Sequence, residues 1–222
     1  IARRIAHEIK NPLTPIQLSS ERLLKKINDS SDHNDPEIQE CVDSITRQVS
    51  EIRFLVDEFS NFARLPNPEF TDCDICSILM KCIDDIKDNY NNIIFDTSNV
   101  DNKFILRCDK SQIIRVFQNI ILNSINSINE SPKNNSNGNV IFRTNLDENR
   151  FIINISDNGS GLKYEKDELI KPYFTTRKKT GGTGLGLSIV EKILFDHDAD
   201  FEINNANDGK TGAIASIYFN LN

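Results

Sequence analysis

The chain has 222 residues, of which 38% are apolar and 27% charged, so one or two soluble domains with a real core are expected. No apolar run approaches the ~18 residues of a membrane-spanning helix. The net charge of −7 disfavours nucleic-acid binding. The five cysteines lack the spacing of a disulfide framework and are expected to be reduced. The chain starts at Ile1 without a signal-peptide pattern, which predicts a fragment of a longer protein.

Two long helices are predicted first. Over residues 37–64, apolar residues recur in alternating steps of four and three, and a rougher stripe of the same kind precedes them over residues 5–27. The polar segment 28–36 between them predicts a turn, with Pro36 in the first turn of the second helix. Such a hairpin cannot bury its stripe alone, so we expect a homodimer that forms a four-helix bundle. We assign residues 1–66 to this domain.

The pattern changes after the proline-containing segment 65–68, which should end the helix. Paired strand-like runs alternate with helical runs, which favours a sandwich of one mixed sheet with helices on one face. The overall class is thus α+β, and residues 67–222 form the second domain. The predicted strands are 93–97, 104–107, 140–146, 151–156, 201–204 and 213–220, and the predicted helices are 76–89, 110–129 and 185–195.

The first segment that can carry chemistry surrounds His7. Helical geometry points His7 away from the stripe that contains Ile5 and Ile9, which leaves its ring in solvent. Glu8 beside it can orient the ring or accept its proton, and Asn11 lies one turn further on the same face. The alternative is an ordinary exposed histidine.

The second segment is a polar stripe on the helix predicted over residues 110–129. Arg115, Asn119, Asn123 and Asn126 follow one another at steps of four, four and three, opposite an apolar face. Amide oxygens in this arrangement can coordinate Mg²⁺ and hydrogen-bond to phosphates. A solvated face rich in asparagine is the alternative.

Two glycine-containing segments complete the set. Asp157 ends a predicted strand and precedes Gly159 and Gly161, which suits an acceptor for an exocyclic amine beside a flat ring but also an ordinary turn. Four glycines fall within residues 181–186, immediately before a helix, and can form a phosphate cradle. Few apolar residues lie in the middle of segment 163–183, so we expect a lid that orders around nucleotide phosphates.

These segments, in this order, resemble the motifs of sensor histidine kinases of two-component systems. His7–Leu13 is similar to the phosphoacceptor box, Asn119–Asn123 to the asparagine box, 157–161 and 182–186 to the two glycine boxes, and Phe174–Thr176 to the phenylalanine box. The extension Asn11–Glu21 resembles nitrogen-regulation kinases of the NtrY kind.

The resemblance implies a dimerisation and phosphotransfer hairpin followed by a GHKL-type (Bergerat) ATP-binding domain, with ATP and Mg²⁺ as cofactors. His7 would be phosphorylated and Glu8 would be the base, while Asn11 would position ATP and, in the reverse reaction, a water for phosphatase activity. Asn123 would bind Mg²⁺, with Asn119 and Asn126 near it. The remaining nucleotide contacts would come from Asp157, Gly159, Gly161, Phe174, Thr175, Thr176, Arg177, Lys178, Gly182, Thr183, Gly184, Leu185 and Gly186.

One residue departs from the family pattern. Many members carry Lys three residues after the magnesium Asn, where this chain has Asn126, so the phosphate contact would be either weaker or supplied elsewhere, by Arg177 or Lys178. The implied partner is the receiver domain of an NtrX-like response regulator, and the implied location is the cytoplasmic part of a bacterial inner-membrane sensor. Two other functions remain open at this point: a GHKL-type ATPase that drives a clamp, and a nucleotide-binding scaffold without catalysis.

Overall fold

The computed structural model describes residues 13–23, 25, 36–63, 66–131, 138–177, 183–206 and 211–221, without the side chains of residue 51 and residues 53–63. The chain divides into two compact units. One comprises residues 1–65 with 175–183, and the other comprises residues 66–174 with 184–222. Each is described by itself.

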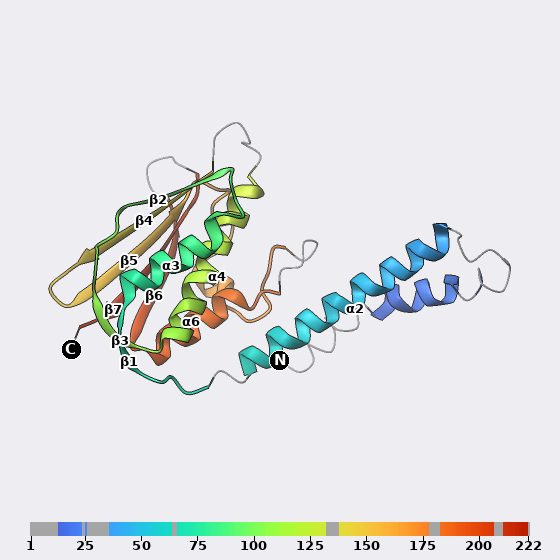
Figure 1. The fold of residues 1–222 in the computed structure, drawn as a ribbon, viewed down its shortest axis with the longest axis horizontal. Helices are drawn as coiled ribbons and strands as arrows, with labels where there is room; N and C mark the ends of the chain where they lie inside the picture. The colour runs from blue at the N-terminus through green and yellow to red at the C-terminus, as the bar shows by residue number, and fades with distance from the viewer. Residues whose placement is uncertain are drawn as a thin grey trace. The chain divides into compact units, whose positions relative to one another are not determined.

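The first unit contains the predicted helical hairpin. Residues 13–23 are helical, and helix α2 runs over Pro36–Ala63, within one residue of the predicted bounds at each end. The Ser19 and Ser44 hydroxyl oxygens lie 3.3 Å apart, so the two helices contact each other side by side (Figure 1). Yet Val42 and Val49 of the predicted seam are 40% and 52% exposed, because one partner helix covers only part of α2.

The second unit is built around a five-stranded sheet with the strand order β2-β4-β5-β7-β6 (Figure 1). Only the β2–β4 pair is parallel, and the other three pairs are antiparallel, so the sheet is mixed as predicted. Its strands are β2 (Ile93–Asn99), β4 (Gly138–Leu146), β5 (Arg150–Asp157), β6 (Ala199–Asn205) and β7 (Ala213–Asn220).

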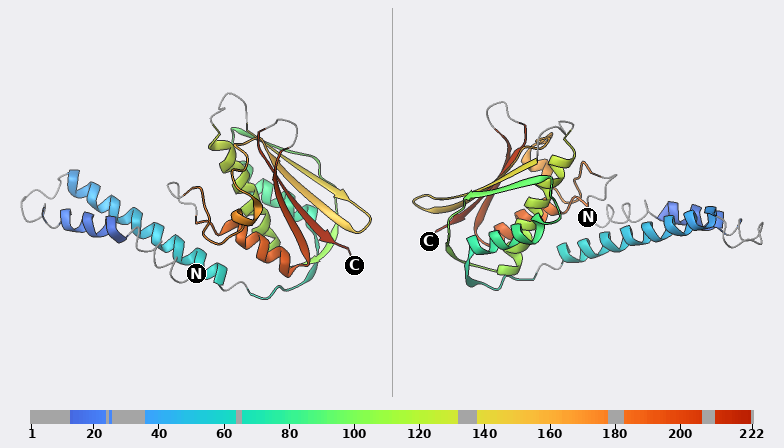
Figure 2. Two further views of the ribbon diagram at one scale, coloured as in Figure 1. Left: turned by 180° about the vertical axis from the view of Figure 1, so that it is seen from behind. Right: turned by 45° about the horizontal axis from the view of Figure 1, so that its top comes forward.

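Helices cover one face of this sheet, as Figure 2 shows. They are α3 (Ile75–Lys87), α4 (Lys110–Asn129) and α6 (Gly186–Asp196). Strand β5 shows why the residues pack this way: Phe151, Ile153 and Ile155 alternate with less buried residues and are fully buried under the helices. Helix α4 supplies the facing layer with Phe117 and Ile121, both fully buried.

One strand assignment needs correction. The predicted strand 104–107 is present as β3 (Ile105–Cys108), but it does not join the main sheet. It pairs instead with β1 (Thr71–Asp74), and the two strands form a separate antiparallel sheet at the start of the domain. Helix α5 (Lys166–Leu169) was not predicted either. Both missed elements are four residues long, too short to show a period.

The α+β class and the two-part architecture are confirmed. Among the residues that the structure describes, no helix combines the length and the apolar character needed to cross a membrane.

Candidate functional site

Asp157 ends β5, with its carboxylate almost completely buried. Its Oδ1 accepts hydrogen bonds from the amides of Gly159 (2.9 Å) and Ala213 (3.4 Å). Ser124 and Ser127 of α4 also hydrogen-bond to this carboxylate. Burial raises the pKa of Asp157 above its ordinary value, and these hydrogen bonds only partly offset that effect. The sheet therefore holds an acidic acceptor against α4 at a cost in stability.

The first glycine loop packs against α4. A Cβ atom on Gly159 would lie 2.3 Å from the Ser127 hydroxyl oxygen, and the Ser160 amide donates to the Ser127 carbonyl. The side chain of Asn205 holds the end of the loop, since it accepts from the Leu162 amide and donates to the Leu162 carbonyl. These contacts give the glycine at position 159 a packing role, whereas the sequence suggested the approach of a ring.

Gly212 closes the same corner from the far end of the sequence. Its φ of +123° is one that residues with a side chain rarely adopt, and a Cβ atom there would lie 1.8 Å from the Asp157 carbonyl oxygen. Only glycine can therefore bring the start of β7 this close to Asp157. The sequence analysis missed Gly212, although a glycine directly before an apolar strand was a usable signal.

The asparagine stripe faces the second glycine segment. Asn119 donates from Nδ2 to the Arg115 carbonyl at 2.8 Å, which fixes the direction of its amide. A Cβ atom on Gly186 would lie 2.8 Å from Asn119 Oδ1 and 3.9 Å from Asn123 Nδ2. The two amides thus lie against the start of α6, where backbone N–H groups are unpaired within the helix. Asn126 is exposed one turn further along α4.

Gly184 and Leu185 fix the entry to α6. Gly184 adopts a φ of +68°, and its carbonyl accepts a 2.8 Å hydrogen bond from the Tyr173 amide. A Cβ atom on Gly184 would lie 2.6 Å from the Phe174 carbonyl oxygen, so the phenylalanine-box residue and the second glycine box are in direct contact. Leu185 is buried, which anchors this turn in the core.

The middle of segment 163–183 has few buried apolar residues, as expected, and α5 has none, but polar and aromatic contacts hold its first half. Lys166 of α5 donates to the Phe201 carbonyl of β6 and lies 3.2 Å from a carboxylate oxygen of Glu191 on α6. Tyr164 and Phe174 pack edge to face, with ring centroids 5.0 Å apart. Beyond Phe174, the Thr175 hydroxyl accepts from the Arg177 amide, while Thr176 is exposed and Thr183 half-exposed.

Several predicted site residues lie outside the described part of the chain. They are His7, Glu8, Asn11, Lys178 and Gly182. The structure therefore brings together the asparagine stripe, Asp157 and the glycines at positions 159, 184 and 186, and it adds Ser124, Ser127, Asn205 and Gly212 to them. Among the described residues, no cluster of three or more His, Cys, Asp or Glu side chains could hold a metal ion.

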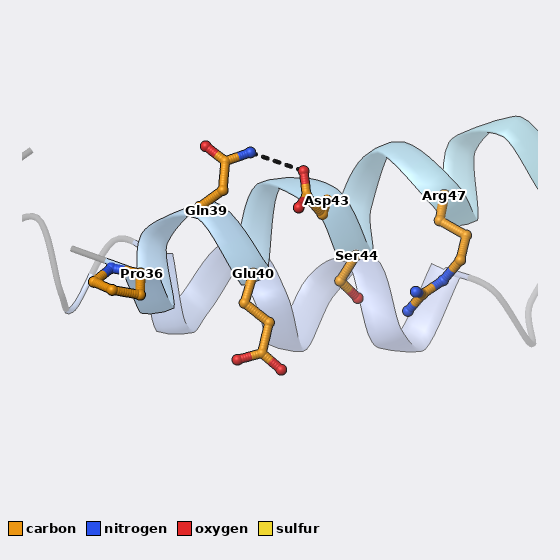
Figure 3. A pocket seen from close by; sticks show the side chains of 6 residues that line it. All are labelled: Pro36, Gln39, Glu40, Asp43, Ser44 and Arg47. Carbon is orange, nitrogen blue, oxygen red and sulfur yellow. Dashed lines mark hydrogen bonds between the residues drawn. The ribbon is translucent and has the colours of Figure 1, made fainter. Parts of the chain in front are cut away.

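A surface pocket lies on the hairpin. Its lining comes from one helix, α2, and consists of Pro36, Gln39, Glu40, Asp43, Ser44 and Arg47 (Figure 3). Gln39 hydrogen-bonds to Asp43 at 2.8 Å, while Glu40 and Arg47 bring opposite charges to the same side. None of the predicted site residues lines this pocket.

Comparisons with known families agree with this arrangement. Residues 1–68 match the His Kinase A (phospho-acceptor) domain, and residues 108–222 match the histidine kinase-, DNA gyrase B- and HSP90-like ATPase family. The nitrogen regulation protein NtrY of Azorhizobium caulinodans is 40% identical over 95% of this chain and 27% of its own length. An NtrY-like sensor histidine kinase of Rickettsia bellii is 37% identical over 100% of this chain and 35% of its own. The chain therefore belongs to the sensor histidine kinases.

Solved structures show the same fold. Histidine kinase ThkA, crystallised in complex with the response regulator protein TrrA, aligns with a TM-score of 0.73 at 22% identity, over 100% of this chain and 61% of its own. The Acinetobacter baumannii histidine kinase AdeS aligns with a TM-score of 0.66 at 20% identity, over 97% of this chain and 98% of its own.

Proposed function

We propose that this chain is the catalytic core of a sensor kinase that transfers the γ-phosphoryl group of Mg-ATP to His7 and then to an aspartate of a response regulator. The observation that carries the proposal is the meeting of two distant segments, around Asp157 and around Gly186, on α4. Asp157, at the end of β5, hydrogen-bonds to Ser124 and Ser127 of α4, and Gly186 lies against Asn119 and Asn123 of the same helix. The acceptor for an amine and the amide ligands therefore lie along one side of α4.

The described residues fit a magnesium nucleotide. Asp157 Oδ1 is occupied by two backbone amides, and its buried carboxylate can accept a hydrogen bond from an adenine amine. Asn123 offers the neutral oxygen that Mg²⁺ accepts alongside water. The lack of a side chain at Gly186 lets the Asn119 amide lie directly against the start of α6, where helix N–H groups suit phosphate oxygens. Bound Mg-ATP would supply the transferable phosphoryl group and spread its negative charge.

The chain's own contribution is mainly positioning. The attack on the phosphoryl group needs a neutral ring nitrogen, and an unperturbed imidazole, with a pKa of about 6.5, offers one at pH 7. We assign Glu8 to accept or orient the ring proton, and Asn11 to hold the nucleotide and, in phosphatase turnover, a water. Thr175, Thr176, Arg177 and Lys178 would contact the polyphosphate, with Arg177 or Lys178 in place of the family lysine.

The proposed assembly is a homodimer with a four-helix bundle. Leu13, Leu18, Val42 and Val49 are 40–52% exposed on the single hairpin, and a second copy would bury them. The relatives are longer than this chain, which spans 27–36% of the length of three NtrY and NtrY-like proteins that it matches. The NtrX-like identity of the regulator and an inner-membrane attachment through other segments rest on resemblance and remain predictions.

Labelling with γ-³²P-ATP tests the function. We expect acid-labile, alkali-stable label on the wild-type chain and none on His7→Gln, which should still bind a non-hydrolysable ATP analogue within a few fold. An ATPase that drives a clamp would release phosphate without labelling the protein, and a silent scaffold would bind nucleotide and do neither. Wild-type labelling of His7→Gln would move the acceptor to another residue.

A further inference from the structure

Residues 66–70, which we call the strap, join the hairpin to β1 and are fastened to the ATP-binding domain at three points. Gln112 donates from Nε2 to the Pro66 carbonyl at 2.9 Å. The Glu69 amide donates to Asp109 Oδ2, also at 2.9 Å. The Phe70 and His197 rings pack with centroids 5.0 Å apart. All three contacts lie where α4 begins and α6 ends.

Asp109 and His197 tie those two helix ends together. Asp109 Oδ1 caps α4 by accepting from the amides of Ser111 and Gln112, at 2.9 and 3.1 Å. The Asp109 amide in turn donates to His197 Nε2 at 3.0 Å. His197 Nδ1 lies 2.8 Å from the Ile193 carbonyl, which can only accept, so Nδ1 carries the proton. The strap is therefore fastened to the same helix that carries Asn119 and Asn123.

Glutamine is an energetically unfavourable residue at position 112. Its side chain is 4% exposed in the first turn of α4, and its Oε1 is buried with no hydrogen-bond partner among the described residues. A buried polar atom without a partner destabilises a fold, and leucine would fill a similar volume without it. The one hydrogen bond that Gln112 gains through its side chain in the described structure is the one to Pro66. Residues that break a local packing rule in this way are commonly retained for function.

We propose that Gln112, Asp109 and His197 form a latch that keeps the connection to the hairpin short and thereby speeds phosphoryl transfer. The inference rests on the proposed function. With the strap fastened, two residues, Arg64 and Leu65, separate the end of α2 from the domain; with the strap released, residues 64–70 would separate them. A longer flexible tether lowers the effective concentration of one site at the other, here by about three- to tenfold. Gln112 is thus a positioning residue that does not touch the nucleotide.

The experiment uses Gln112→Leu and Phe70→Ala in the full chain. We expect faster hydrogen exchange at the Glu69 amide, an unchanged dissociation constant for a non-hydrolysable ATP analogue, and an unchanged KM for ATP. The rate of labelling from saturating γ-³²P-ATP should fall about three- to tenfold. Gln112→Leu should unfold at the same temperature as the wild type or a higher one. Phe70 is 39% exposed, so its truncation should not unfold the core.

Thr144→Val is the matched control. Thr144 also tethers a backbone amide, that of Asp101, at 2.7 Å, but it lies in β4, away from the strap and the asparagine stripe. It should label at the wild-type rate. Fast exchange of the strap with wild-type labelling, or slow labelling with an equal loss of nucleotide affinity, would overturn the latch, as would unchanged exchange at Glu69. If the wild type does not label at all, the proposed function fails, and the Glu69 exchange alone decides whether the latch exists.

Discussion

The two units of this chain differ in how completely they bury their own apolar side chains. In the ATP-binding domain, side chains such as Phe117, Phe142 and Phe151 are fully buried within one chain. On the hairpin, Val42 and Val49 of the predicted seam are largely exposed. The domain can thus complete its core alone, while the hairpin needs a second copy. The unit with the complete core is the one that carries the ATPase family match, and the hairpin carries the phospho-acceptor match.

The largest effect is expected where the domain is most tightly packed. Gly212→Val would place a branched side chain at a φ of +123° and against the Asp157 carbonyl. Strain at such positions costs about 1–3 kcal/mol, and the clash adds to it, so we expect a loss of about 3 kcal/mol or more. Urea unfolding of the chain would measure it.

Gly138→Ala is the control for that substitution. A Cβ atom at Gly138 would also be crowded, at 2.6 Å from Ile128 Cγ2 and 3.0 Å from Ile93 Cγ1, but it would meet side-chain atoms rather than backbone, and the φ of Gly138 is not positive. A similar loss in both variants would show that backbone approach at Asp157 is not the cause.

The next effect concerns binding rather than folding. Asn123→Ala should weaken affinity for a magnesium-loaded ATP analogue about ten- to hundredfold, because a hydrogen bond or ligand to a charged group is worth about 1.5–3 kcal/mol. Isothermal titration with and without Mg²⁺ would measure the change. Asn129→Ala, an exposed asparagine at the end of the same helix, should bind normally. Equal affinities in the two variants would reduce the asparagine stripe to a solvated surface.

The length of an element and the regularity of its pattern decided how well the sequence predicted it. Helix α4 was predicted to the residue, because an apolar face twenty residues long repeats its period many times. The strand 104–107 was found, but its partner Thr71–Asp74 has no alternation, so its separate sheet was not. Pattern reasoning also singled out Asp157, Asn119 and Asn123 as candidate site residues, because their neighbours in sequence form motifs.

Residues that meet only in the fold escaped prediction. Asn205 holds Leu162, and Gly212 approaches Asp157, each across more than forty residues of sequence. Lys166 has no motif around it, and its bonds to Phe201 and Glu191 depend on how β6 and α6 pack. Such contacts arise only in the tertiary structure, and no local pattern of apolar and polar residues predicts them.

A charge on the hairpin should weaken dimerisation without changing the stability of the ATP-binding domain. Val49→Asp would place a carboxylate in the proposed dimer interface, and burial of one valine contributes about 1.5–3 kcal/mol. We expect self-association to weaken tenfold or more in sedimentation experiments, with the unfolding temperature of the ATP-binding domain unchanged. Ser50→Asp, at an exposed neighbouring position, should associate like the wild type. Equal weakening by both substitutions would point to charge rather than burial.

The smallest effect compares two carboxylates within the domain. Burial would raise the pKa of Asp109, but hydrogen bonds from the Glu69 and Gln112 amides and from Ser111 hold it below its ordinary value of about 3.9. A lowered folded pKa stabilises the fold above the unfolded pKa, and that stability is lost as the pH falls through the folded value. For Asp157, whose folded pKa is raised, the sign reverses: the fold loses stability as the pH rises from about 4 through the folded pKa.

Asn substitutions should reveal the two opposite dependences of the unfolding free energy on pH, each worth about 1.4 kcal/mol for every unit by which folding shifts the pKa. Relative to the nucleotide-free wild type, Asp157→Asn should gain stability as the pH rises from about 4 to 7, because it removes the cost of a buried charge. Asp109→Asn should be destabilised at pH 7 and approach the wild type only as the pH falls below about 4. Urea unfolding at several pH values would measure both. We interpret the buried Asp157 carboxylate as kept for its ligand at a cost in folding stability, and Asp109 as kept for the stability of the fold and the strap. If the unfolding free energies of the two variants changed with pH in the same direction, this interpretation would be wrong.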